Sequence, residues 1–294
     1  MSKAGNTANT SSASSSNDVI VEFRTNQIRP FKSLFDSIKN NLPDTSIFFD
    51  QSGMKIMQVD ALKTFLVNVR LEGENFEYYH CAPESETGTP MVELNLSTLH
   101  LNQTFKSTSN DDNILRFVYE KNSDTVQIII SSDKKLEERV YDIPIQNPDE
   151  NVQIGEISGV SNFPYSLTMP CADLQRICRD FKNLNSEKIS ITHDGSNLKF
   201  SCLGTIKSTI NRRGKTEKSE DSVHFTKTPV DSTYSDVFKF STLNEFSKCQ
   251  AGGESKIVRI LLKQGEPIVL HFEIGTLGEM SVAIAPHIDD ALCL

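Results

Sequence analysis

The chemistry that this sequence offers most clearly is phosphate binding by cations on helices. At about 100° per residue, the run Cys171–Leu184 places Leu174 and Ile177 on one side of a helix. Arg176 and Arg179 fall almost opposite that apolar side. For one helix taken alone, two arginines on a solvent-facing surface indicate solubility more often than a binding site. The interpretation therefore depends on whether the chain repeats the arrangement.

No catalytic constellation accompanies these cations. The sequence contains no HExxH, P-loop, GxSxG, dinucleotide-binding or paired metal-carboxylate motif. His193 and Asp194 precede Gly195, and turn chemistry accounts for this pair. His80 and His271 have no partners at metal-ligand spacing, which favours core or surface histidines over ligands. We therefore predict a protein that is not an enzyme and that holds no metal or cofactor.

Composition bounds the class of protein. The chain has 294 residues, a formal net charge of −9 and a pI near 5.2, which excludes a molecule coated in positive charge but allows a local basic surface. Its length suggests two domains of about 150 residues. No apolar run approaches the roughly 20 residues that span a bilayer. The six cysteines show no CxxC pair or metal-finger spacing, which is typical of reduced thiols inside a cell.

Two stretches differ from the rest in composition. Residues 1–17 are small and polar and lack the apolar segment of a secretory signal, so we predict a disordered tail. Residues 146–163 are rich in Pro, Asn, Gly and Ser and predict an exposed connector. The expected domains are therefore residues 18–145 and 164–289, with 290–294 as a C-terminal tail.

Hydrophobic periodicity predicts the same order of elements on both sides of the connector: strand, helix, strands, helix, strands. The stretch Glu74–Pro90 is polar and turn-rich and predicts no strand. In the last helix, Thr242 and Glu245 stand at capping-box spacing. The four predicted helices are Phe31–Leu42, Ser97–Ser107, Cys171–Leu184 and Thr242–Ala251.

Two landmarks give one repeat offset. The first helices align Phe31 with Leu174, a shift of 174 − 31 = 143, and the strands after the second helices align Ile114 with Ile257, where 257 − 114 is again 143. A duplicated set of basic helices favours a positive surface that contacts phosphates without reading bases. The basic residues on or near the solvent-facing sides of the helices are Lys32, Lys39, Lys106, Arg176, Arg179 and Lys248.

Several segments carry a resemblance to a known family. They are Phe31–Leu42, Ser52-Gly53-Met54 through Val59-Asp60, Leu71–Phe76, Arg176–Asp180, Gly195 with Leu198–Ser201, and Ala285-Pro286-His287-Ile288. Together they resemble proliferating cell nuclear antigen, the eukaryotic sliding DNA clamp, from about Val19 to Asp289. The resemblance implies an α+β DNA-clamp fold with two topologically equivalent domains, each with two helices packed on antiparallel sheets. Three such subunits would close head to tail into a ring, with helices inside and sheets outside.

The resemblance also implies sites and partners. The six helix cations would contact double-stranded DNA through its backbone, without sequence preference. A second site would bind a peptide motif of DNA polymerase, the clamp loader and other proteins. Its implied residues are Val59, Leu66, Ile154, Ile157, Pro267, Ala285, Pro286 and Ile288. The implied protein is a homotrimeric processivity factor of the nucleus, or of a viral replication compartment.

Some residues depart from the family pattern. Lys63 and Thr64 replace a typical His-aliphatic pair beside the peptide pocket, and the connector reads Gln153–Ile157 where an aliphatic-proline pair is usual. Pro144 lies in the strand expected to pair with the next subunit, and Thr205–Arg212 is the expected partner strand. Two other hypotheses stay open from the sequence: a scaffold that does not encircle DNA, and one subunit of a heterotrimeric checkpoint-type clamp.

Overall fold

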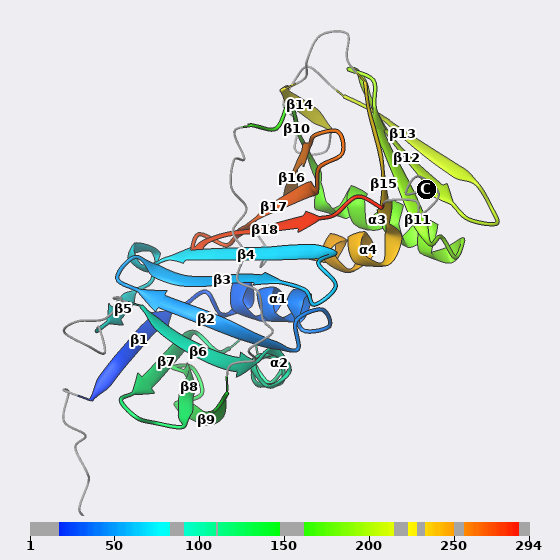
Figure 1. Cartoon of the computed structure of the whole chain (residues 1–294). Helices are drawn as coiled ribbons and strands as arrows, with labels where there is room; N and C mark the ends of the chain where they lie inside the picture. The colour runs from blue at the N-terminus through cyan, green and yellow to red at the C-terminus, as the bar shows by residue number, and fades with distance from the viewer. Residues whose placement is uncertain are drawn as a thin grey trace, which may run out of the picture.

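Two similar halves follow each other along the chain (Figure 1). The computed structural model describes residues 18–82, 91–109, 111–147, 162–214, 223–227, 233–249 and 256–287. The first half contains β1 (Val19–Thr25), α1 (Ile28–Ile38), β2 (Asp44–Asp50), β3 (Gly53–Val59), β4 (Phe65–Glu72), the 3-10 helix η1 (Gly73–Asn75), β5 (Tyr78–Cys81), β6 (Val92–Ser97), α2 (Thr98–Lys106), β7 (Ile114–Glu120), β8 (Thr125–Ser132) and β9 (Glu137–Gln146). The second half contains β10 (Tyr165–Pro170), α3 (Cys171–Asn183), β11 (Lys188–His193), β12 (Asn197–Leu203), β13 (Ser208–Arg213), β14 (His224–Lys227), β15 (Tyr234–Lys239), α4 (Phe240–Ser247), β16 (Ile257–Leu262), β17 (Ile268–Ile274) and β18 (Gly278–Ile284).

The repeat predicted from the sequence is present in the structure. The first helices of the halves begin at Ile28 and Cys171, and 171 − 28 = 143. The strands β7 and β16 begin at Ile114 and Ile257, which gives the same offset of 143. Within each half the two helices pack on each other, α1 on α2 and α3 on α4. The fold is therefore α+β with two equivalent halves, as predicted.

One sheet crosses both halves. Its 14 strands run in the order β14-β10-β16-β17-β18-β4-β3-β2-β6-β9-β8-β7-β1-β5, and a second sheet has the order β13-β12-β11-β15. The halves join where β18 pairs antiparallel with β4, from Gly278 opposite Leu71 to Ile284 opposite Phe65. We call this β4–β18 pairing the seam. Its central side chains are buried, so the halves share one apolar core.

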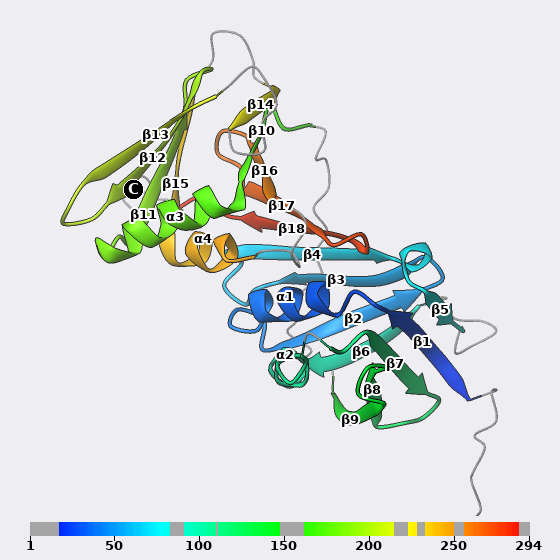
Figure 2. The same cartoon turned by 180° about the vertical axis from the view of Figure 1, so that it is seen from behind.

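The four helices lie along one side of the molecule in the order α3, α4, α1, α2 (Figure 2). In the first half, Phe35 of α1 stacks on Phe105 of α2 with 5.5 Å between ring centroids. Phe23 of β1 stacks on Phe117 of β7 at 5.0 Å in the same core. Burial of such rings contributes much of the free energy that holds helices on a sheet. Within the described ranges, none of the helices combines the length and apolarity that a membrane crossing requires.

The structure corrects some element bounds. Helix α1 begins at Ile28, one turn earlier than predicted, because Pro30 in the first turn loses no helical hydrogen bond. Helix α4 begins at Phe240, so Thr242 lies inside the helix and is buried. The predicted capping box of Thr242 with Glu245 is therefore wrong. Strand β5 lies in the stretch that was predicted to contain only turns.

Candidate DNA and peptide interfaces

The six residues predicted to contact DNA all lie on the row of four helices or directly after a helix end. Two of them, Lys39 and Lys248, are the C-cap residues of α1 and α4. The exposed members of the set are Lys106, Arg176, Arg179 and Lys248, and the half-buried members are Lys32 and Lys39. The structure thus brings all six predicted cations to the helix side of the molecule.

Three of these cations are paired with carboxylates on their own helices. The pairs are Lys39 with Asp36, Arg176 with Asp173 (3.7 Å) and Asp180 (3.4 Å), and Lys248 with Glu245 (2.7 Å). The hydrogen bond from Lys39 is the main reason why the pKa of Asp36 lies below its ordinary value. The sequence prediction missed these acids, although a carboxylate three residues before each cation was a visible signal. Their negative charge weakens the positive field of the helix side.

The other three cations, Lys32, Lys106 and Arg179, have no ion pair with any residue that the structure describes. Lys182, in the last turn of α3, is a further exposed cation that the sequence prediction omitted. The sequence feature that could have revealed Lys182 is its position three residues after Arg179, on a neighbouring part of the same helix surface. Long cations without an ion pair suit contact with phosphates, because they position a duplex without reading its bases.

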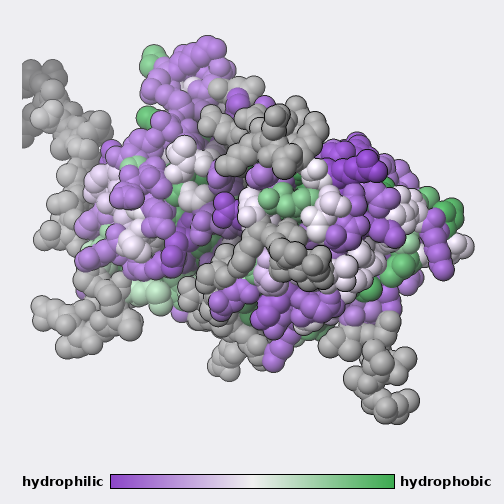
Figure 3. All heavy atoms as spheres, turned by 90° about the horizontal axis from the view of Figure 1, so that it is seen from above, coloured by the Kyte–Doolittle hydropathy of each residue, from purple (hydrophilic) through white to green (hydrophobic). Residues whose placement is uncertain are grey.

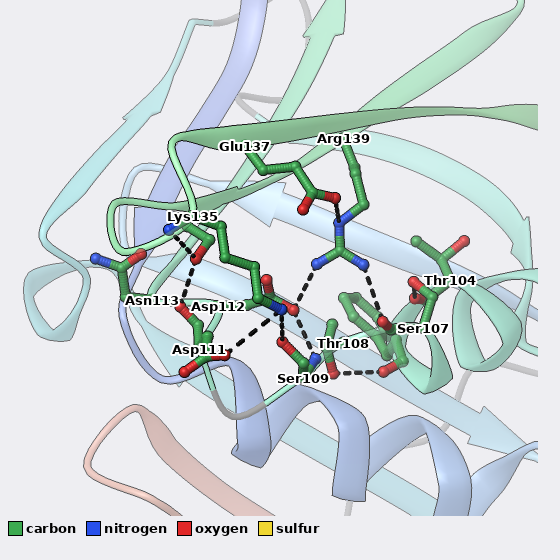
Figure 4. A network of polar contacts seen from close by, with 12 residues as sticks. Thr104, Ser107, Thr108, Ser109, Asp111, Asp112, Asn113, Lys135, Glu137 and Arg139 are labelled. Carbon is green, nitrogen blue, oxygen red and sulfur yellow. Dashed lines mark hydrogen bonds and ion pairs between the residues drawn. The ribbon is translucent and has the colours of Figure 1, made fainter.

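A polar network fixes the end of α2 to strand β9 (Figure 4). Arg139 of β9 lies 2.5 Å from Asp112, whose side chain is only 1% exposed, and it donates to the carbonyl oxygen of Ser107 at 2.9 Å. Burial opposes ionisation of Asp112, but the hydrogen bond from Arg139 holds the pKa of this carboxyl below its ordinary value. Asp111 accepts from Lys134 at 2.8 Å in the neighbouring turn. The network thus fixes the end of α2, the helix on which Lys106 lies.

A surface cavity of about 300 Å³ lies over the seam between the halves. It gathers four residues of the predicted peptide pocket from both halves: Val59, Leu66, Pro267 and Ala285. The predicted neighbours Lys63 and Thr64 also line it. Lining residues that the sequence prediction missed are Phe65, Phe163, Glu266, Val269 and Ala283. The cavity can accept a small apolar side chain between two charged residues, Lys63 and Glu266.

The remaining predicted pocket residues do not line this cavity in the described structure. Pro286 is half-buried and forms a bridge with Phe238 of β15, directly after the cavity residue Ala285. Ile154, Ile157 and Ile288 lie outside the described residues. Seen from above, hydrophobic residues reach the surface as small separate patches among hydrophilic ones (Figure 3). Such patches suit a single anchoring side chain better than a broad apolar interface.

Asp60 shapes the loop beside this cavity. Its carboxylate accepts from the hydroxyl of Thr64 at 2.8 Å and from the backbone N–H of Phe65 at 2.7 Å. Its carbonyl accepts from the N–H of Lys63 at 2.9 Å. Lys63 has a φ of 55°, a conformation that costs free energy for a residue other than glycine. Asp60 therefore holds Lys63 at the rim of the cavity.

Comparison with known proteins agrees with this architecture. Residues 20–153 match the model of the N-terminal domain of proliferating cell nuclear antigen, and residues 159–287 match that of its C-terminal domain. The chain belongs to the proliferating cell nuclear antigen family. The resemblance that the sequence motifs indicated is thus confirmed over both halves.

Relatives of the family span nearly the whole chain. The chain is 28% identical to the "Probable DNA polymerase sliding clamp 1" of Paramecium bursaria Chlorella virus 1, covering 92% of this chain and 97% of that protein. It is 29% identical to proliferating cell nuclear antigen of Dictyostelium discoideum, covering 91% and 99%. The crystal structure of the Entamoeba histolytica protein superimposes with a TM-score of 0.77 at 17% identity, covering 92% and 100%. This last likeness shows the fold.

Cys178, Cys249 and His193, whose side chains could in principle react, are buried in the core of this family member. Burial raises the pKa of Cys178 to about 11 and that of Cys249 to about 12, so both thiols are protonated and unreactive at neutral pH. His193 ends strand β11, is fully buried and stacks on Phe225 at 4.4 Å, so it belongs to the core rather than to the predicted turn. The described residues contain no group of His, Cys, Asp and Glu that could hold a metal ion.

Proposed function

We propose that this chain is a DNA sliding clamp, a ring that encircles duplex DNA and tethers DNA polymerase and other replication or repair proteins as a processivity factor. The observation that carries the proposal is the row of four helices, which places six cations on one side of an otherwise acidic molecule. A ring that must slide needs weak backbone contacts rather than base recognition. Such a clamp tethers enzymes and catalyses nothing itself.

Ring closure requires two open strand edges, and the structure provides them. Strand β13 is the outermost strand of the four-stranded sheet. Among the described residues, the outer edge of β9 pairs only with β6, and only at Ile145 and Gln146. The N–H of Ile145 donates to Asp124 on the β8 side, so the nitrogen of Pro144 faces the outer edge. The missing donor thus falls directly before the two residues of β9 that pair with β6, and the earlier residues of β9 keep their donors for pairing.

The charges of these two edges are complementary. Strand β9 carries Glu137, Glu138 and Asp142, and β13 ends in Arg212 and Arg213. Arg212 also binds Asp173 of α3, which ties the edge strand to the row of helices. Opposite charges on the two edges favour the pairing of β9 with β13 of the next copy over pairing of identical edges. Three copies joined head to tail would form the homotrimer.

The cavity over the seam supplies the tether for partners. We assign it, with Ile154, Ile157, Pro286 and Ile288, to the binding of a short peptide motif from DNA polymerase, the clamp loader and other proteins. An apolar anchor in a small pocket, supplemented by backbone pairing, is a recurrent way to bind such peptides. A clamp of this kind acts in the nucleus, or in a viral replication compartment if a virus encodes it.

Light scattering and DNA retention together test this function. We expect a solution mass near three times the subunit mass of 32.9 kDa. After loading onto a nicked circular plasmid, the protein should remain bound and should be released when the plasmid is cut. Reversing the charges of Lys32, Lys106 and Arg179 should shorten retention about tenfold without changing the mass. A mass of one subunit, or equal retention on circular and linear DNA, would favour a scaffold that does not encircle DNA or a heteromeric clamp.

A further inference from the structure

The cavity over the seam is a trough above the end of β18. Side chains alternate between the two faces of a strand, and Val282 and Ile284 of β18 point into the core. Ala283, and Ala285 directly after the strand, therefore point outward, and both line the cavity. Their small side chains leave a depression above β18, which lies between β17 and β4 in the sheet (Figure 1).

The strands on either side form the walls of this trough. Val269 of β17 lies opposite Ala283 on one side, and Leu66 of β4 lies opposite it on the other. Towards the end of the trough, the carbonyl oxygen of Thr64 accepts from the N–H of Ala285 at 2.9 Å, so the pairing of the two strands continues there. The register of the seam thus sets an apolar trough that is one strand wide.

A charged residue stands beside each wall. Lys63 lies two residues before Phe65, the first residue of β4, and Glu266 lies two residues before Ile268, the first residue of β17. Phe65 and Ile268 are both opposite Ile284 of β18. Neighbouring strands lie about 4.8 Å apart, so roughly 10 Å separate the backbones of the two charged residues across the trough. A cation and an anion therefore flank the trough on opposite sides.

Both charges are available to a bound partner. Lys63 is exposed and forms no ion pair with a residue that the structure describes, because the carboxylate of Asp60 accepts from Thr64 and Phe65 instead. Glu266 is paired with Lys263 at 3.5 Å, where the two side chains are 51% and 44% exposed. Such an exposed pair is weak because water competes for both charges, so a partner can replace it.

The backbone of Lys63 gives a second reason to assign a role to this residue. Its φ of 55° lies in the left-handed region, where glycine or asparagine has a lower conformational cost than lysine. Stability therefore does not account for a lysine at this position. Residues in such conformations cluster at functional sites. The turn directs this cation to the rim of the trough at a cost in stability.

We propose that the trough selects its partner peptide by charge. The peptide carries an apolar anchor in the trough, an acidic side chain beside Lys63 and a basic side chain beside Glu266. This inference rests on the peptide site of the proposed function and names the chemistry of its partner. A separation of 10 Å corresponds to about three residues of an extended chain. Complementary charges at an interface exclude wrong partners more than they raise affinity, and Lys63 would admit an acid to a molecule whose net charge of −9 otherwise repels it.

Selection from random peptides of about twelve residues, several times the expected charge spacing, tests the proposal. Peptides displayed on phage are selected on the full chain, and those that also bind Ala283→Leu, in which a larger side chain fills the trough, are removed. The remaining peptides should carry an acid and a base on opposite sides of an apolar residue. Selection on Lys63→Glu should replace the preference for the acid by a preference for a base at the same position.

A charge-reversal cycle with one selected peptide measures the contact directly. In fluorescence anisotropy, Lys63→Glu should weaken binding about threefold, and a lysine in place of the peptide's acid should restore the affinity. Salt at about 1 M should remove the difference. Lys63→Gln, which adds no negative charge, should weaken binding by a smaller factor. Lys121→Glu makes the same charge change in the exposed β7–β8 turn and should leave the affinity unchanged.

The outcomes separate this inference from the proposed function. Trough-dependent peptides without a charge preference, or an unchanged affinity in Lys63→Glu, would overturn the inference and leave the peptide site intact. If no peptide depends on the trough, the peptide site of the proposed function is wrong, and the inference fails with it.

Discussion

Ion pairs in this protein differ in how much they contribute to the stability of the fold. Asp112 is nearly inaccessible and is held by Arg139, whereas Asp111 is paired with Lys134, which is 78% exposed. An exposed ion pair contributes about 0–1 kcal/mol, because water competes for both charges. A buried carboxylate that loses its partner keeps its desolvation cost without compensation. Of these two pairs, Asp112–Arg139 therefore contributes more to stability.

Arg139→Met should lower the free energy of unfolding by about 2 kcal/mol at neutral pH, because it leaves the Asp112 carboxylate buried without its partner. The pKa of Asp112 is depressed in the folded state, so the stabilisation is present above the unfolded pKa and is lost as the pH falls through the folded pKa. The loss caused by Arg139→Met should therefore shrink in acid. Urea unfolding at neutral pH and at a pH near 3, below the ordinary pKa of an aspartate, measures both effects.

Lys134→Met is the control for this prediction, and it should leave the free energy of unfolding nearly unchanged, because water competes for both charges of this exposed pair. Equal losses in the two variants at neutral pH would contradict the assigned role of the buried pair.

Among the elements, periodicity predicted all four helices and the repeat, because their apolar stripes face a continuous core. It failed at β5, whose residues alternate between exposed and half-buried positions at the edge of the sheet and carry little apolar signal. Thr242 and Glu245 matched a capping box, yet Phe240 and Leu243 are buried, and helix α4 starts earlier to bury them. Tertiary packing thus prevailed over the local motif.

The candidate sites were predictable to different degrees. Four residues that the resemblance assigned to a peptide pocket line one cavity in the structure. Phe163 and Glu266 were missed because they stand far apart in the sequence and meet only after the strands pair. The pairing of Arg176 with Asp173 and Asp180 could be inferred from their spacing in the sequence. That these acids offset the positive charge of Arg176 could be concluded only from the side-chain geometry.

The seam between the halves depends on a glycine of β18. A Cβ on Gly278 would come within 2.0 Å of the carbonyl oxygen of Arg70 on β4, so Gly278→Ala should force the two strands apart. We expect the free energy of unfolding to fall by about 1–3 kcal/mol, the usual cost of overpacking. Gly204→Ala is the matched control, since the nearest atoms to its Cβ lie at 3.6 Å, and it should be nearly neutral. Thermal unfolding of both variants tests this prediction. Equal melting temperatures of Gly278→Ala and Gly204→Ala would show that the seam tolerates a side chain.

At the scale of the whole molecule, the 14-stranded sheet makes the two halves one mechanical unit. The seam joins strands of both halves through seven opposed residue pairs. The helices continue this connection, because α1 of the first half packs against α4 of the second. In the ring that we propose, each subunit has to keep its two edge strands at a fixed spacing, and a continuous sheet provides that rigidity. The halves should therefore unfold together, although each has its own helix pair.

Val282→Ala tests this coupling. Val282 is opposite Val67 across the seam, and neither side chain is exposed, so the substitution removes buried contacts that both halves share. We expect the free energy of unfolding to fall by about 2 kcal/mol, through lost burial and a residual cavity. Native-state hydrogen exchange should then show equal losses of protection in β2 of the first half and β16 of the second, because both open only in global unfolding.

Ile128→Val, placed in the core of the first half away from the seam, should give the same uniform pattern with a smaller loss of about 1 kcal/mol. Loss of protection confined to one half in either variant would mean that the halves unfold separately and that the shared sheet does not couple them.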